Sequence, residues 1–483
     1  MIRRAPSAHI HPAEILHFLW RYAFLLLIPL VRQLAVSQGS AWERLSAALS
    51  NLVMTLLVVA AAVVRWYTVR FSAGRGMIHY AAGVLRQERR QIPVRAVDCL
   101  VQRAGPIALL CGAARVSLET SAGSRRKADV QVLLTRKKAH RLFVLLAGDH
   151  RKTQYYAPSV WRVAAMAASW SNGFSGLLIA APFIQKTGQI LGEEASRLLY
   201  DTVDFRLQLV SLGLPPVAAG LAWVLFGGWL FALLNQWMRY WRFCGWRQGA
   251  FLASRSGVFH SRRRLFRVSR IRAVTARQTL LMSWAGLSTA YAHIAGDRKD
   301  KNPNAVVAVS MARAPLLRQL RATLGYAPKG AKIKPPPRAA SGYLTPVLLP
   351  VAAVSLLAVL LNGTGAPVAL PFLSLPVIAI LVWRALVRMQ ALGSAYFQPG
   401  EQFVTVSRDR GFSLLTTVIP KQNVTMVRLS QTVFQKRSGL CHVRLSVYGE
   451  RPLHCTVRHL DYQKVRKACE RYGLLPSQEG RPV

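Results

Sequence analysis

The sequence predicts a mixed α+β membrane protein, with six transmembrane helices in three hairpins, each followed by a cytoplasmic β module. Three observations predict it. The 483 residues are 52% hydrophobic, with a mean hydropathy of +0.24. Lys and Arg number 64 against 19 Asp and Glu, a formal net charge of +45. Apolar and basic stretches alternate three times along the chain. A disordered polycation is excluded, because it would lack the apolar residues that build a core.

Six apolar stretches approach or reach the roughly 20 residues that a helix needs to cross a bilayer. They cover residues 18–36, 47–66, 160–184, 207–237, 343–361 and 366–386. The alternative is a set of helices buried in a large soluble core. The first stretch also has features of a cleaved signal peptide. We favour a retained helix, because Arg32 interrupts the apolar run and because cleavage of this stretch would leave an odd number of spans.

The charges predict one orientation for all three hairpins. The loops inside the hairpins, residues 37–46, 185–206 and 362–365, have net charges of 0, −1 and 0. The segments that follow the hairpins, residues 65–158, 238–342 and 384–483, carry +13, +19 and +10. Because Lys and Arg gather on the cytoplasmic side of membrane proteins, we expect a multi-pass protein of the cytoplasmic (inner) membrane with both termini and all three basic segments inside.

The three basic segments are internal repeats. A gap-free alignment places their central parts over one another, each a stretch with the same 19-residue spacing. The stretches begin at Pro93, Arg267 and Pro420 and end at Gly112, Gly286 and Gly439. Apolar residues recur at matching places within them, for example Val97, Ile271 and Val424. The repetition predicts three copies of one folding unit.

Each repeat reads as short antiparallel strands followed by one helix. MIHYAAGVL and AFLASRSGVF predict a strand, a Gly-containing turn and a second strand, and VRLSVYG alternates with a period of two. Each repeat then closes with apolar residues at helical spacing, around Leu142 and Phe143, Leu316 and Leu320, and Val465 and Cys469. The predicted unit is therefore a small β structure with a C-terminal helix.

At these motifs the repeats resemble the bacterial pleckstrin-homology-like (PH-like) domain of YdbS/YdbT-type membrane proteins. The resemblance rests on a Gly turn, an Ile-Pro strand end, a Val-rich strand and a Gly-Leu turn. The second repeat departs from it with Phe266-Arg267 in place of Ile-Pro, and the third with Arg410-Gly411 in place of the early Gly. It implies two antiparallel sheets of seven strands in total plus a C-terminal helix in each module. The matching structural residues are Gly83, Pro93, Gly112, Gly257, Gly286, Pro420 and Gly439.

These observations divide the chain into alternating hairpins and modules. The expected boundaries are 1–66 for the N-terminal tail and first hairpin, 67–158 for the first PH-like module, 159–237 for the second hairpin, 238–330 for the second module, 331–342 for a Pro-rich basic linker, 343–386 for the third hairpin and 387–483 for the third module.

No enzyme chemistry is predicted. Paired carboxylates are scarce, and Glu193-Glu194 fits an acidic loop on the outer side of the membrane. The six cysteines form no Cys-x-x-Cys pair and no zinc spacing. We also find no phosphate-binding Gly-rich loop and no nucleophile elbow. The sequence therefore predicts no catalytic residue, no metal site and no cofactor.

The basic clusters are the remaining signal. Cationic side chains just inside a membrane helix attract anionic headgroups, at about 1 kcal/mol for each charge near the surface. A role in setting topology is the alternative for any one cluster. Nucleic acid is not expected as a partner, because no reading motif accompanies the charge. The candidate contacts for anionic lipid or a partner are Arg262, Arg263, Arg264, Arg267, Arg270, Arg86, Arg89 and Arg90.

The expected function is a non-enzymatic membrane scaffold. Its modules would bind proteins, including like modules, and anionic lipid headgroups. An exposed strand edge on each module would permit strand addition, so a homo-oligomer or a complex with a related smaller PH-like membrane protein is expected. The alternative function is an oligomeric transport or envelope-stress and resistance component that handles a membrane-active compound.

Overall fold

The computed structural model describes residues 8–21, 41–74, 76–84, 87–120, 129–148, 150–170, 216–258, 260–294, 305–327, 330–363, 369–448 and 453–474. The chain divides into two compact units. The first unit comprises residues 1–155, 246–270 and 296–303, and the second comprises residues 156–245, 271–295 and 304–483. The division passes through the second repeat, whose strands are therefore shared between the units.

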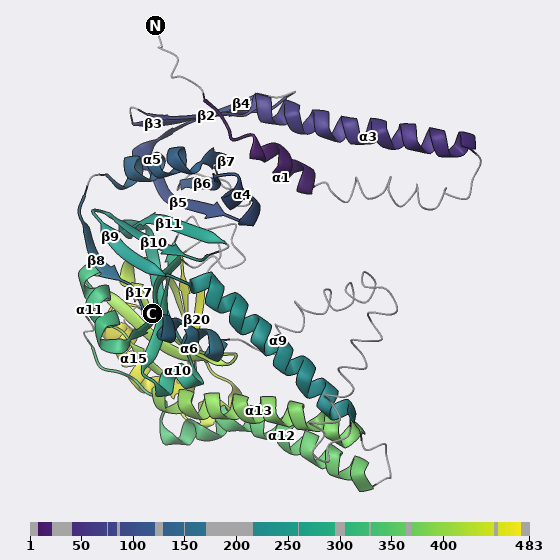
Figure 1. Ribbon diagram of the computed structural model, residues 1–483. Helices are drawn as coiled ribbons and strands as arrows, with labels where there is room; N and C mark the ends of the chain where they lie inside the picture. Colours follow the sequence, from purple (N-terminus) through teal and green to yellow (C-terminus); the bar gives the residue numbers. More distant parts are fainter. Residues whose placement is uncertain are drawn as a thin grey trace, which may run out of the picture. The chain divides into compact units, whose positions relative to one another are not determined.

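Each repeat supplies two groups of three strands. Figure 1 labels the strands of the first repeat from β2 to β7. In the first repeat the strands are β2 (Arg70–Gly74), β3 (Met77–Ala82), β4 (Glu88–Pro93), β5 (Val97–Ala104), β6 (Ala113–Thr120) and β7 (Val130–Thr135). In the second they are β9 (Cys244–Gln248), β10 (Phe251–Ser256), β11 (Ser261–Arg267), β12 (Ile271–Thr279), β13 (Leu287–Ile294) and β14 (Ala305–Ala312). In the third they are β15 (Tyr396–Gln398), β16 (Phe403–Arg410), β17 (Ser413–Pro420), β18 (Val424–Ser430), β19 (Leu440–Val447) and β20 (Leu453–Asp461).

The sheets join successive repeats. The first shared sheet has seven strands in the order β7-β6-β5-β11-β10-β9-β8, where β8 spans Lys152–Tyr156. β5 of the first repeat therefore pairs with β11 of the second. Likewise β14, β13 and β12 continue into β17, β16 and β15 of the third repeat. The first sheet of the first repeat and the last sheet of the third stand without such a partner, in the orders β1-β2-β3-β4 and β18-β19-β20. The expected pair of separate sheets in each module is therefore replaced by sheets that fuse neighbouring modules.

The segment before each hairpin adds a further strand to the first two repeats and a single bridge to the third. β1 (Ala8–His9) pairs with β2, and β8 lies beside β9. In the third repeat Ile333 forms a single bridge with Phe397 of β15. The strand that enters each hairpin thus lies beside the strand that leaves it, so strand pairing holds the two ends of each hairpin together.

A short helix and a closing helix complete each repeat. The short helices are α4 (Pro106–Leu110), α10 (Leu280–Trp284) and α14 (Val433–Arg437), and the closing helices are α5 (Arg136–Ala147), α11 (Arg313–Leu324) and α15 (Tyr462–Arg471). The predicted apolar stripes face the core, with Leu142, Leu316 and Val465 all buried. Gly112, Gly286 and Gly439 follow the short helices with φ of +66°, +66° and +65°, where a side chain would be strained.

Paired helices lie between the repeats. α1 (Ala13–Arg21) contacts α3 (Ala41–Thr68), and α6 (Val160–Trp170) contacts α9 (Pro216–Tyr240). α12 (Ala340–Gly363) and α13 (Ala369–Ser394) run side by side (Figure 1). Large apolar residues are exposed on α3 and α12, including Leu56 and Leu349. Among the described residues one helix, Pro337–Leu360, meets the length and hydropathy that a membrane span requires.

All six membrane spans stay predictions. The described residues omit most of two predicted spans, 18–36 and 160–184. They also omit the whole of loop 185–206 and half of loop 362–365. The described helix pairs agree in order with the predicted hairpins, because each pair falls between one repeat and the next or before the first.

Candidate anion pocket beside the last helical hairpin

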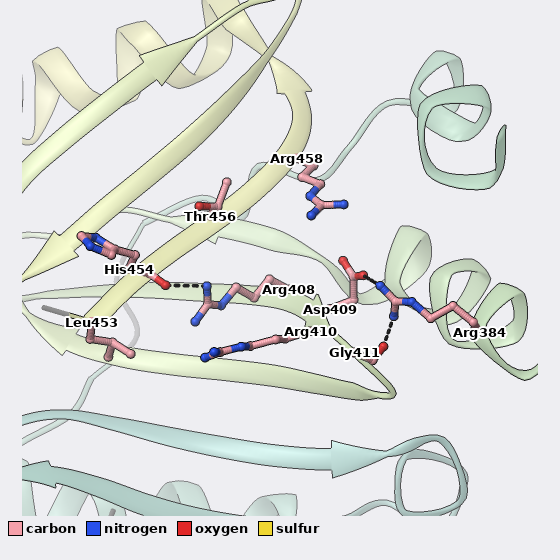
Figure 2. A pocket seen from close by; sticks show the side chains of 9 residues that line it. All are labelled: Arg384, Arg408, Asp409, Arg410, Gly411, Leu453, His454, Thr456 and Arg458. Atoms are coloured by element: carbon pink, nitrogen blue, oxygen red, sulfur yellow. Dashed lines mark hydrogen bonds and ion pairs between the residues drawn. The ribbon is translucent and has the colours of Figure 1, made fainter. Parts of the chain in front are cut away.

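A cationic pocket of about 370 Å³ lies in the second unit, between β16, β20 and α13. Figure 2 shows the side chains that line it. Four arginines face it against a single carboxylate, so a net positive charge surrounds the cavity. The lining residues are Arg384, Arg408, Asp409, Arg410, Gly411, Leu453, His454, Thr456 and Arg458.

Two of the arginines are fixed by the fold. The Arg384 guanidinium on α13 donates to the Asp409 carboxylate at 3.1 Å and also to the Gly411 carbonyl. The Arg408 guanidinium donates to the His454 carbonyl at 2.6 Å, and its residue is only 8% exposed. Asp409 is thereby neutralised by Arg384, and β16 is tied to both α13 and β20.

The other two arginines extend into the pocket without a bond to its walls. Figure 2 draws hydrogen bonds and ion pairs for Arg384 and Arg408, whereas none joins Arg410 or Arg458 to the residues drawn. Arg410 ends β16 at a two-residue turn, where Gly411 has a φ of +61°. Arg458 stands on β20, an exposed residue on the opposite wall. Each of these guanidinium groups carries five N–H donors that can bind a ligand of opposite charge.

Burial lowers the pKa of Arg408, and the nearby Arg410 adds to this. Burial also affects the pKa of His293 on β13, whose Nε2 lies 2.8 Å from the Thr275 hydroxyl. Loss of hydration, followed by the charge of Arg408, lowers the pKa of His293 to about 4. A bound anion would offset the crowding of positive charge here, because an opposite charge favours the charged form of a cation.

The pocket lies at the end of a predicted membrane span. Arg384 is next to Trp383 on α13, two residues before the expected end of span 366–386. Both Trp383 and Phe412, at the turn beside Gly411, are exposed. Trp and other aromatic residues favour the headgroup level of a bilayer, where one side is apolar and the other wet. An anion held in this pocket would thus lie at the level of lipid headgroups.

The predicted cluster in the second repeat has a different role in the structure. Arg263 stacks on the Phe143 ring, with its guanidinium carbon 3.5 Å from the ring centroid, and contacts His140 at 3.0 Å. Arg264 is 6% exposed in the middle of the sheet. Arg270 pairs with the buried Asp98 at 3.0 Å. These contacts use the charge to hold β11 and the segment after it against the first repeat.

Two further members of the cluster also make contacts within the first unit. Arg267 donates to the Arg95 carbonyl at 2.8 Å and lies over the Phe251 ring. Arg262 lies directly opposite Arg103 of β5, which in turn lies opposite Arg115 of β6. This row places three arginines on neighbouring strands of one sheet.

In the first repeat, Arg90 and Arg89 lie on β4. Arg90 bonds to the Glu88 carboxylate at 2.5 and 2.9 Å and to the Asp129 carbonyl, while Arg89 contacts Gln87 at 3.4 Å. Arg86 lies outside the described residues. The structure therefore does not bring the predicted arginines of the two repeats together in one described pocket.

The arginines of the anion pocket were not among the predicted contacts, because they do not form a dense run in the sequence. Neighbouring arginines on a strand point to opposite faces, so a dense run such as Arg262 to Arg264 cannot line one cavity. Arg408 and Arg410 are two apart and share a face, directly before a Gly turn. That spacing is the available signal, whereas Arg384 and Arg458 come near only through the fold.

The comparisons agree with the repeats. A family model for the bacterial PH domain matches residues 23–149, 203–327 and 345–472. Each match begins within an expected hairpin and ends within a few residues of a closing helix, α5, α11 or α15. No curated protein and no solved structure matches the chain. Since the three matches cover most of the sequence, the prediction of tandem PH-like modules is confirmed, and the chain belongs to the bacterial PH domain family.

Proposed function

We propose that this chain is a non-enzymatic scaffold of the cytoplasmic membrane, of the YdbS/YdbT type, whose last PH module binds a phosphate-bearing anionic lipid headgroup. Six helices in three hairpins would anchor it, with the PH modules and both termini in the cytoplasm. The anion pocket of the third repeat, rather than the arginine run of the second, would receive the headgroup.

The strand pairs at the hairpin ends support this topology. β1 pairs with β2, and Ile333 pairs with Phe397, so the entry and exit of each of these hairpins lie on one side of whatever it crosses. The excess of Lys and Arg in the repeats supports the cytoplasm as that side. The exposed apolar residues of α3 and α12 then face lipid.

The observation that carries the proposal is the pair Arg410 and Arg458, two exposed residues that line the cationic pocket. A phosphate diester offers acceptor oxygens that guanidinium groups bind with two parallel hydrogen bonds. Hydrogen bonds to charged groups contribute about 1.5–3 kcal/mol each. A zwitterionic headgroup carries the same diester, but its ammonium group offsets the negative charge, so the four arginines of the pocket should favour an anionic headgroup.

Calorimetric titration of the full chain in zwitterionic detergent tests the proposal. The probes are dihexanoyl phosphatidylglycerol, dihexanoyl phosphatidylcholine and inorganic phosphate. We expect the phosphatidylglycerol to bind and the phosphatidylcholine not to bind. Either Arg410→Ala or Arg458→Ala should weaken binding about tenfold, as expected from the loss of one charged hydrogen-bonding group.

Arg437→Ala is the matched control, because it removes the same charge from an exposed residue of α14 that does not line the pocket. It should leave the affinity unchanged. Equal binding of inorganic phosphate and phosphatidylglycerol would identify a free anion as the ligand and refute the lipid proposal. Equal losses in all three variants would show only a general charge effect and refute the pocket.

A further inference from the structure

The two junctions between repeats use the same strands in the same register. In the first junction, Val101 of β5 lies opposite Arg264 of β11. In the second, Thr275 of β12 lies opposite Thr417 of β17. The repeat alignment makes Thr275 the equivalent of Val101, and Thr417 the equivalent of Arg264. The neighbouring pairs Leu100 with Leu265 and Val274 with Val418 are equivalent in the same way. The two junctions therefore pair equivalent strands in the same antiparallel register.

The third repeat has the docking strand, but no described strand pairs with its outer edge. β18 is equivalent to β5 and β12, and it ends its sheet among the described strands. Its residues are largely exposed, with Met426 at 47%, whereas β5 is buried along almost its whole length. Only Arg428 is charged within the strand. Natural proteins usually protect a strand edge with charge, proline or a covering segment, and β18 shows little of this.

The first repeat has the opposite, complementary edge. β4 is equivalent to β11 and β17, and it ends the sheet β1-β2-β3-β4. Glu88, Arg89 and Gln91 on β4 are exposed, whereas no residue of the equivalent strand β17 is exposed. The chain thus carries both halves of the junction, one on each end of its series of repeats.

We propose that β18 of one copy of this chain pairs with β4 of a second copy, in the antiparallel register that the two internal junctions share. That register places Met426 opposite Ile92, Leu429 opposite Arg89 and Ser430 opposite Glu88. It also places Arg428 opposite Arg90, two like charges, but Glu88 lies diagonally within reach of Arg428 and already neutralises Arg90. The contact is head to tail, so repetition yields a ring or a filament.

This inference deepens the scaffold part of the proposed function and is independent of the anion pocket. A pocket variant such as Arg458→Ala should keep the association. Loss of lipid binding with intact association, or the reverse, would therefore separate the two proposals.

Disulfide mapping between two differently tagged copies tests the register. Cys111 and Cys244 are replaced by Ser in both copies, and the four remaining cysteines are buried. One copy carries Leu429→Cys or Val427→Cys, and the other carries Arg89→Cys or Gln91→Cys. Each copy has one new thiol, so any new disulfide between the two tags joins different molecules.

The pairs 429 with 89 and 427 with 91 are in register, and 429 with 91 and 427 with 89 are slipped by two residues. We expect about tenfold more disulfide for the in-register pairs, because a disulfide requires Cα atoms within about 7 Å. Equal yields in all four combinations, or no disulfide between tags, would overturn the proposal. So would a disulfide of the Leu429→Cys copy with a different membrane protein in place of the second copy. A chain that carries both thiols and cross-links only to itself would also refute the association.

Discussion

The guanidinium of Arg384 lies 3.1 Å from the carboxylate of Asp409, and this ion pair joins α13 to β16 at the anion pocket. The Asp409 side chain is 6% exposed and that of Arg384 is 19% exposed. The pair therefore links a predicted membrane helix to the sheet that carries the binding residues. A shift of α13 would be transmitted directly to Arg408 and Arg410, which flank Asp409 in the sequence.

Arg384→Ala should reduce the free energy of unfolding, because it leaves the Asp409 carboxylate buried without its ion-pair partner. The expected loss is about 1–3 kcal/mol. Arg384→Ala with Asp409→Asn should recover part of it, since the lone charge is then removed. Urea unfolding in detergent, followed by circular dichroism, measures both. Arg466→Ala is the control, because its ion pair with Glu470 is more open to solvent and should contribute less. A double variant less stable than Arg384→Ala would contradict the explanation.

Arg263→Lys should destabilise the first unit and leave lipid binding intact. Lysine keeps the charge but loses the planar stacking on Phe143, which contributes about 0.5–2 kcal/mol. The unfolding midpoint and the phosphatidylglycerol titration report the two effects. Arg255→Lys, on the neighbouring strand β10 and exposed, is the matched variant and should change neither. If the Arg263→Lys protein stays stably folded but binds lipid more weakly, the arginine run of the second repeat is the lipid site and the pocket of the third repeat is not.

Acidification should destabilise the second unit through His293. Its pKa is about 4 in the folded chain, below the ordinary value of 6.5, so the unfolded chain binds a proton first as the pH falls. Stability is therefore full above pH 6.5 and declines towards pH 4, by at most about 3 kcal/mol from this residue. His293→Gln should flatten this part of the curve. Urea midpoints at pH 7.5 and 4.5 check it, and an unchanged pH dependence in His293→Gln would exclude His293 as the cause.

A thiol at residue 195 should react with a membrane-impermeant maleimide only from outside the cytoplasmic membrane. Ala195→Cys lies in the expected outer loop 185–206, whereas Arg410→Cys lies in the third repeat. With Cys111 and Cys244 replaced by Ser in both variants, sealed right-side-out vesicles should label the first and not the second, and inverted vesicles should give the reverse. Labelling of residue 195 from the cytoplasmic side would overturn the topology.

The sequence predicted the local structure well, because local structure depends on spacing. Leu142, Leu316 and Val465 mark the closing helices, and the glycines at 112, 286 and 439 occupy the same left-handed turn. It did not predict that half of one module pairs with half of the next. β5 and β11 are about 160 residues apart, and a buried strand reads the same whether its neighbour belongs to its own repeat or another.

The pairing of an entry strand with an exit strand also dictates an order of events during synthesis. β8 has no partner until the ribosome has made all of residues 157–243 and then β9. In the proposed membrane topology, the next sheet would form only after a hairpin has returned the chain to the side of the membrane where it entered. A helix inserted in the wrong direction would leave β9, β10 and β11 on the wrong side, and the exposed edge of β5 would mark the nascent chain as unfinished.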